Sequence, residues 1–428
     1  MDFLPAFRGS AMTLSIALSF SLLPATATAQ QESDESPAPP VLEHAPMVYL
    51  DCRRCPETHL RTEIDFVNYV REASAAQVHI IITDQPTGGG QLYTMAFIGR
   101  NAFAGMDQTL TYSEPQNATD AQTRDGLTRI MRVGLVPYVA RTQLVDRLRV
   151  SLTSEAGSAP AQVGADAWRN WTFEVYGGGN FNTESSQDSW SARYGFYANR
   201  VTPEWKVRLR PYFNHNSRTI RRTDQDDIHV RQRRHGWESY LIKSLGGHMG
   251  AGVFVDYLTA DVDNMRHGVT ITPAIEYSYY PYSEATRRSM TLTYRVGYEV
   301  NDYIEETIYE KTEESLANHS LNASVQFRQP WGSISSGITG FSYLHDSDFH
   351  RIAVNGNVSF RLGGGVSLNV GGNYQRINDQ LNLPRRGASL EDVLLQRQRL
   401  ATSYRGSGNI GLSYTFGSMF SNVVNPRL

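Results

Sequence analysis

The stretch Met290–Val300, MTLTYRVGYEV, alternates between two kinds of side chain along its whole length. Its even-numbered positions are apolar or aromatic, whereas its odd-numbered positions are Thr, Arg, Gly or Glu. Because successive residues of a β-strand point to opposite faces of a sheet, this pattern predicts a strand with one apolar and one polar face. Similar alternation recurs around 269–279, 321–328 and 352–361, so the chain from residue 168 onward is predicted to be β-structure.

Alternation alone fits two architectures, a soluble sandwich with the apolar face inside and a membrane barrel with that face in lipid. The predicted strands are long, about 12 to 16 residues, whereas strands of soluble sheets average about 5 to 6 residues. Aromatic residues also gather near the predicted strand ends, as in the girdle of a membrane barrel: Trp168, Trp171, Trp205, Tyr279, Tyr280 and Trp331.

The connections between these strands alternate in length, as the periplasmic turns and outer loops of bacterial barrels do. Tight turns are predicted at 201–203, 244–247, 281–285, 329–332 and 362–365. Longer polar loops are predicted near 216–227, 259–267, 301–315, 344–350 and 378–401. The predicted fold class is therefore mainly β, with an outer-membrane antiparallel barrel of about twelve strands over 168–418 and a C-terminal tail over 419–428.

The N-terminal region predicts export. An apolar run from Ala11 to Leu23 is followed by the small residues Ala25-Thr-Ala-Thr-Ala29, a pattern typical of a secretory signal peptide over 1–29. After it, no run of about 18 apolar residues appears, which excludes helical membrane spans. Segments 30–46 and 151–167 are rich in Pro, Ser, Ala or acidic residues and are predicted to be linkers.

Residues 47–150, between these linkers, are predicted to form a small periplasmic α+β domain. A strand over 47–51 precedes a helix over about 57–72, and three strands follow over 77–84, 91–99 and 108–113. A second helix, capped by Asp120, is predicted to run to about Val133. Gly88-Gly89-Gly90 is predicted to be a hairpin turn, since no Lys-Ser/Thr follows as in a phosphate loop.

The last predicted strand resembles the C-terminal recognition signal of outer-membrane barrels. Asn409, Gly411, Tyr414 and Phe416 fill its polar, glycine and two aromatic positions, although this chain continues beyond Phe416. The strand pattern of 168–418 is also similar to that of the putative salt-induced outer-membrane proteins, a barrel family without an established activity. The resemblance implies an outer-membrane location, with membrane lipid and the barrel-assembly machinery as partners.

Ten charged residues fall on the polar side of the alternation and are predicted to line the lumen: Glu174, Arg193, Lys206, Arg208, Arg210, Asp256, Glu276, Arg295, Glu299 and Arg328. Two interpretations remain open. The charges either set the selectivity of a water-filled channel, or pair across a narrow barrel and seal it. The basic stripe Lys206, Arg208 and Arg210 would favour anions in an open pore.

Cys52 and Cys55 are the only two cysteines of the chain. In an exported protein a C-x-x-C pair is first interpreted as a structural disulfide. A thiol–disulfide oxidoreductase is the alternative, because the pair lies between a strand and a helix N-terminus and encloses Arg53 and Arg54, features that favour a thiolate.

Other candidate sites are weaker. His345, Asp346, Asp348 and His350 cluster in a predicted outer loop and form only a weak candidate for a divalent-cation site. No Ser–His–carboxylate constellation of a barrel lipid hydrolase is recognisable around His215, His235, His248 or His319-Ser320. No cofactor motif is recognised, and the net charge of −3 makes nucleic acid an unexpected partner.

The sequence therefore predicts a non-enzymatic barrel that acts as a narrow channel or structural element, with a periplasmic domain that docks a protein partner. The oxidoreductase and the lipid hydrolase remain alternatives.

Overall fold

The computed structural model describes residues 41–52, 55–87, 90–151, 167–222, 226–387 and 400–422. The predicted signal peptide and most of the first linker lie outside these residues. Within them, no helix has the length and apolar character needed to cross a membrane.

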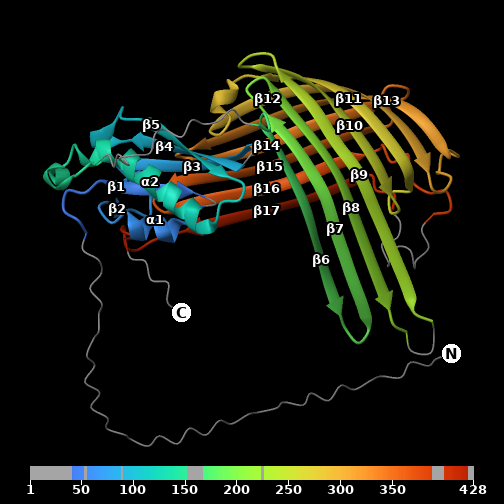
Figure 1. Ribbon diagram of the computed structural model, residues 1–428, viewed down its shortest axis with the longest axis horizontal. Coiled ribbons are helices and arrows are strands. Elements are labelled where there is room, and N and C mark those ends of the chain that lie inside the picture. The colour runs from blue at the N-terminus through green and yellow to red at the C-terminus, as the bar shows by residue number, and fades with distance from the viewer. Residues whose placement is uncertain are drawn as a thin grey trace, which may run out of the picture. The chain divides into compact units, whose positions relative to one another are not determined.

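The N-terminal module is a five-stranded sheet with two helices (Figure 1). Along the chain it comprises β1 (Met47–Cys52), α1 (Glu57–Glu63), β2 (Asn68–Tyr69), β3 (Val78–Thr87), β4 (Gly90–Gly99), β5 (Gln108–Pro115) and α2 (Asp120–Val139). The strand order is β2-β1-β3-β4-β5, with β1 parallel to both of its neighbours and the other pairs antiparallel. Its core consists of buried side chains from sheet and helices, including Leu50, Leu60, Ile80, Phe97, Leu127 and Tyr138.

Two helix boundaries differ from the sequence prediction. The first helix ends at Glu63 instead of Glu72, because the chain from Asn68 pairs alongside β1 through the bond from Val70 N to Val48 O (2.9 Å). The second helix is capped by Thr119 instead of Asp120, in a reciprocal capping box with Gln122. It also continues six residues beyond the predicted end, to Val139.

The second half of the chain forms a twelve-stranded antiparallel sheet in which every strand pairs with its neighbours in sequence (Figure 1). The strands are β6 (Trp171–Thr183), β7 (Gln187–Val201), β8 (Trp205–Ile220), β9 (Ile228–Ser244), β10 (Met249–Ala260), β11 (Met265–Ser278), β12 (Arg288–Tyr303), β13 (Glu313–Gln329), β14 (Gly332–Tyr343), β15 (His350–Gly363), β16 (Val366–Ile377) and β17 (Tyr404–Tyr414). They have 11 to 17 residues each, so the predicted strand number and unusual strand length are confirmed.

The five predicted tight turns all lie between strands of this sheet, at one end of it. One predicted outer loop is wrong: β10 and β11 are joined by only Asp261–Asn264, not by a loop over 259–267. Asn264 closes this turn with a φ of 54°, a left-handed conformation that asparagine tolerates better than most residues.

The edge strands β6 and β17 do not pair with each other among the described residues. Beyond β17 the tail returns to the module, where Phe420 forms an antiparallel bridge with Val70. Ser421 N donates to Tyr69 O (2.9 Å), and Arg71 N donates to Met419 O (3.0 Å). The tail beyond the expected end of the barrel thus adds a single β-bridge next to β2.

Candidate functional site

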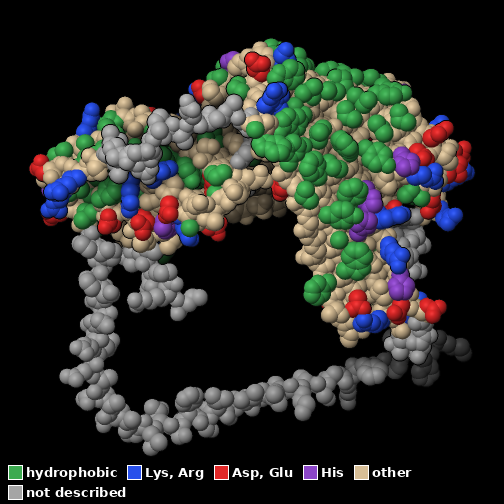
Figure 2. All heavy atoms as spheres, viewed as in Figure 1, with side chains coloured by type: hydrophobic (Ala, Val, Ile, Leu, Met, Phe, Trp, Pro, Cys, Tyr) green, Lys and Arg blue, Asp and Glu red, His purple; other side chains and the backbone are tan. Residues whose placement is uncertain are grey.

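One face of the twelve-stranded sheet is apolar and exposed. Figure 2 shows hydrophobic side chains gathered on this surface. Its exposed large residues come from across the sheet and include Val175, Leu241, Ile271, Ile275, Leu292, Val296, Leu321, Ile338, Val354, Val370 and Ile410. Among the described residues no second sheet packs on this face, so the interior of a sandwich is not formed here.

All ten predicted lumen residues lie on the opposite, polar face. Residues directly opposite in a ladder point to the same side, so the strand register tests this placement. One row pairs Arg210 with Glu238, then Asp256, Thr270 and Glu299. A second row runs from Lys206 through Ile242, Gly252 and Ala274 to Arg295. The remaining residues fall on the same side by strand alternation. Whether this face encloses a lumen stays a prediction.

Some charged side chains on the polar face have close ionic or hydrogen-bond partners. Arg210 forms an ion pair with Glu238, a residue that the sequence prediction missed (2.8 Å). The carboxylate of Glu299 accepts hydrogen bonds from Tyr343 Oη (2.8 Å) and Asn301 Nδ2 (3.2 Å). That of Glu276 accepts from Tyr282 Oη (3.0 Å) and Thr293 Oγ1 (2.9 Å).

Several cations on this face have no such compensation. Among the described residues, no carboxylate lies within 4.0 Å of Arg193, Lys206, Arg208 or Arg295. Arg193 and Arg208 instead donate to the amide oxygens of Asn214 and Asn199. The face therefore carries positive charge that is not cancelled by close ion pairs.

At the long-loop end, the segment after β16 folds over the polar face. Leu381 packs with Leu316 and Tyr343, which both belong to that face. The same segment pairs with the β12–β13 loop through a bridge between Thr307 and Pro384. The side-chain amide of Asn382, also in this segment, donates a hydrogen bond to Asp263 O (2.7 Å). The described part of this loop thus packs on apolar and aromatic residues of the polar face.

At the short-turn end, the module contacts the sheet through a partly buried ion pair. Arg361 of β15 lies 2.9 Å from Asp51 of β1, and its guanidinium also lies over the ring of Tyr49. His79 of β3 is fully buried, with Nε2 3.5 Å from the same carboxylate. A second contact joins Gln116 Nε2 to Glu174 of β6 (2.7 Å). The sequence prediction missed the cluster of Asp51, His79 and Arg361, because nothing local links these residues.

The protonation states of this cluster follow from burial and charge. Burial opposes the ionisation of Asp51, but its side-chain contacts with His79 and Arg361 and the positive charge of Arg361 outweigh it and lower the pKa of the carboxyl to about 2. Burial lowers the pKa of His79, against the opposing effect of Asp51. At neutral pH the ion pair of Asp51 with Arg361 is therefore intact beside a neutral imidazole.

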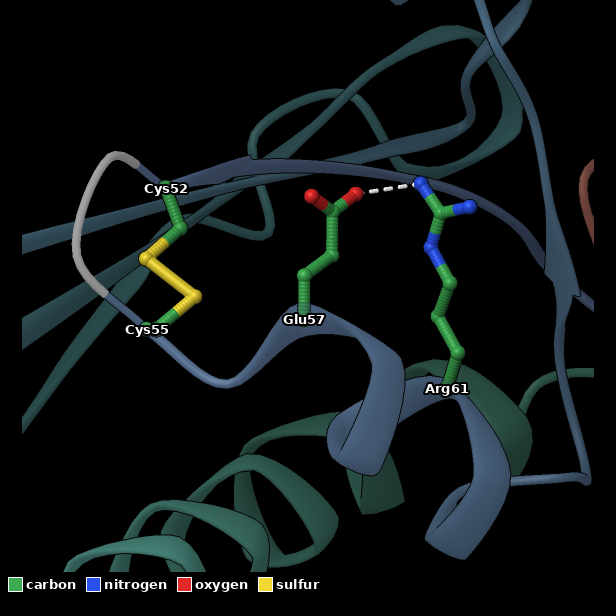
Figure 3. Close-up of a disulfide and its surroundings, with 4 residues drawn as sticks. All are labelled: Cys52, Cys55, Glu57 and Arg61. Carbon is green, nitrogen blue, oxygen red and sulfur yellow. Dashed lines mark hydrogen bonds and ion pairs between the residues drawn. A yellow bond between two sulfur atoms is a disulfide. The ribbon is translucent and has the colours of Figure 1, made fainter. Parts of the chain in front are cut away.

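Cys52 and Cys55 form a disulfide that joins the end of β1 to the start of α1 (Figure 3). Both cysteines pack against the core of the module, and an ion pair between Glu57 and Arg61 lies on the helix that follows. This packing fits a structural disulfide. Arg53 and Arg54 lie outside the described residues.

The other sequence candidates are not brought together into sites. Asp346 accepts from the backbone of Asp348, His350 contacts Ser347 O, and His345 stacks on Phe349. Within the described ranges, no group of three or more His, Cys, Asp or Glu is arranged to hold a metal ion. Of the assembly signal, Asn409, Gly411 and Tyr414 lie in β17, whereas Phe416 follows it.

The histidines considered for lipid hydrolysis lie on strands of the sheet or beside them, and they contact aromatic side chains, each other or backbone. His215 contacts Tyr194 (3.2 Å) and stacks edge-on with His235, His319 contacts Tyr294 (3.4 Å), and His248 contacts Ser278 O (2.8 Å).

Comparison with known proteins adds little to this description. No protein-family model matches the chain, and no curated protein matches it. The resemblance to the putative salt-induced outer-membrane proteins thus gains no support from sequence. One similar solved structure is described as the NanC porin in a rhombohedral crystal form, with 12% identity, a TM-score of 0.24, and coverage of 57% of this chain and 100% of that chain. A TM-score of that size carries no argument about fold or function.

Proposed function

We propose that this chain is an outer-membrane β-barrel protein whose twelve-stranded sheet closes by pairing β6 with β17. The observation that carries the proposal is the exposed apolar face opposite a charged one. In water such a surface is unfavourable, but it suits the lipid-facing wall of a barrel. In a bilayer the unpaired edges of β6 and β17 would lack hydrogen-bond partners, which favours closure.

The strand lengths agree with this proposal. The shortest interior strands, such as β10, have 12 residues. At about 3.3 Å per residue they span about 40 Å, and a tilt of about 45° reduces this to about 28 Å across the membrane. That value matches a hydrocarbon core of about 30 Å. The short turns and the module then lie on the periplasmic side.

We further propose that the enclosed face forms a narrow channel that prefers anions. The uncompensated charges of Lys206, Arg208 and Arg295 support this preference. The loop around Leu381 at one end and the module at the other restrict the path, which favours a low conductance.

The double substitution Lys206→Glu and Arg208→Glu is expected to change the preference from anions to cations. Both side chains lie on the polar face of β8, so the substitution replaces two positive charges with two negative ones. The reversal potential of the purified protein in a planar bilayer under a KCl gradient measures the effect.

The matched control is Arg376→Glu, which reverses the same type of charge on the apolar face of β16. It should leave the reversal potential unchanged. An unaltered preference in the double variant contradicts the assignment of these residues to the pore. Absence of any conductance in the unmodified protein contradicts the channel and leaves a structural barrel with a docking module.

A further inference from the structure

A hollow lies in the polar face near the short turns. Gly252 of β10 and Ala274 of β11 are direct cross-strand partners, and Gly250 adjoins them on the same face. Because Gly250 and Gly252 carry no side chain and Ala274 carries only a methyl group, a hollow remains over this part of the sheet, with the Ile242 side chain packed closely beside Gly252. Ile242, Phe254 and Tyr282 supply apolar and aromatic walls.

Two long cationic side chains line this hollow from opposite sides. Lys206 and Arg295 stand at the two ends of the row that contains Gly252 and Ala274. Their backbones are four strands apart, about 19 Å at a spacing of about 4.8 Å. The Arg295 guanidinium reaches across β11 to lie 4.7 Å from the ring centre of Phe254. Lys206 Nζ lies 5.6 Å from the ring centre of Tyr240, on the intervening strand β9.

The charges around the hollow leave these two cations available. Neither has a carboxylate within 4.0 Å among the described residues. Glu276 also lines the hollow, but Tyr282 and Thr293 already donate hydrogen bonds to its two oxygens. Glu204 and Lys243, which also line the hollow, carry opposite charges.

We propose that this hollow binds a small organic carboxylate with an apolar or aromatic body. The carboxylate accepts hydrogen bonds from Lys206 and Arg295, and the body occupies the space over Gly252 and Ala274 against Phe254. Charge-assisted hydrogen bonds to the carboxylate supply specificity. Contact with the apolar walls makes burial of the ligand body favourable. The inference rests on the proposed anion preference of the same face and names the solute class.

Binding is tested by calorimetry on the full-length protein in detergent, with benzoate as the probe and benzamide, acetate and chloride as comparisons. Benzoate is expected to bind more tightly than all three, because only benzoate combines the charge with the ring. Arg295→Gln should weaken benzoate binding about tenfold or more, as expected for the loss of a charge-assisted hydrogen bond. Ala274→Leu should also weaken it, since the new side chain fills the hollow and leaves both cations in place.

Arg218→Gln is the matched control, because Arg218 lies on the same strand and face as Lys206 but outside the hollow. It should bind benzoate like the unmodified protein. Benzoate affinity no greater than that of acetate, or full affinity in Ala274→Leu, overturns the inference. Calorimetry does not depend on conductance, so the two proposals can fail separately. Benzoate binding without conductance would leave a carboxylate site and no channel. Anion conductance without benzoate binding would leave a channel that lacks this site.

Discussion

Arginine in place of Val354 is expected to destabilise the folded protein in a bilayer by about 2 to 4 kcal/mol. Val354 lies on the apolar face of β15, between Ile338 of β14 and Tyr374 of β16. In the proposed barrel a guanidinium placed there meets hydrocarbon, where a charged group loses its hydration. Denaturant unfolding of the protein folded into phospholipid vesicles measures the change.

Asn355→Arg is the control for that substitution. Asn355 is the next residue of the same strand, it is exposed, and it points to the polar face. The same side chain at this position should change the free energy of unfolding by much less. Equal destabilisation by both variants would show that the two faces of the sheet lie in the same environment, which contradicts the barrel.

The second large effect is expected from Asp51→Asn. This substitution leaves the guanidinium of Arg361 without its carboxylate, and the arginine side chain is only 28% exposed. We expect the module to be less stably attached to the sheet by about 1 to 3 kcal/mol. Hydrogen exchange of the β1 and β3 amides reports the loss, since both strands lie beside the ion pair.

A double-mutant cycle and a pH series sharpen this test. If Asp51 acts through Arg361, Asp51→Asn combined with Arg361→Met should cost less than the sum of the single changes. In the unmodified protein the contribution of Asp51 is present above its unfolded pKa of about 3.9. It is lost as the pH falls through the folded pKa of about 2. Unchanged protection across this range, or additive single effects, would show that the pair does not hold the module.

A separate loss is expected at higher pH from His79. Burial lowers its pKa, so the unfolded chain takes up a proton more readily than the folded module does. Protection should therefore begin to fall below about pH 6.5, and this part of the decline should remain in Asp51→Asn.

The strands of the sheet were predictable because their residues alternate between an apolar face and a polar face. Met290–Val300 alternates without interruption, and it lies within β12. The polar-face assignment of Arg210 or Glu299 follows from the same period, so it needed no tertiary information. Alternation does not say which face is covered, however, and the exposure of residues such as Ile271 emerges only from the three-dimensional structure.

The module was harder to predict because its boundaries depend on contacts distant in sequence. Val67 and Val70 fit a helical period with Leu60 and Ile64, yet the chain pairs with β1 there and with the tail at Phe420. Pairing across 350 residues has no local signal. The same reason explains why Asp51 and Arg361 were not recognised as partners.

The sheet order and the exposed apolar face lead to one central claim, that β6 and β17 meet in the membrane. Cysteine cross-linking tests it most directly, since the native cysteines are already joined to each other. Val175→Cys, on the apolar face of β6, is combined in turn with cysteine at each position of β17 on that face: Tyr404, Gly406, Gly408, Ile410, Leu412 and Tyr414.

A disulfide requires Cα atoms within about 4.4 to 6.8 Å of each other. A closed barrel therefore predicts that one position, or two adjacent ones, cross-links in protein extracted from outer membranes. The absence of a cross-link at all six positions in folded, membrane-extracted protein would contradict the barrel.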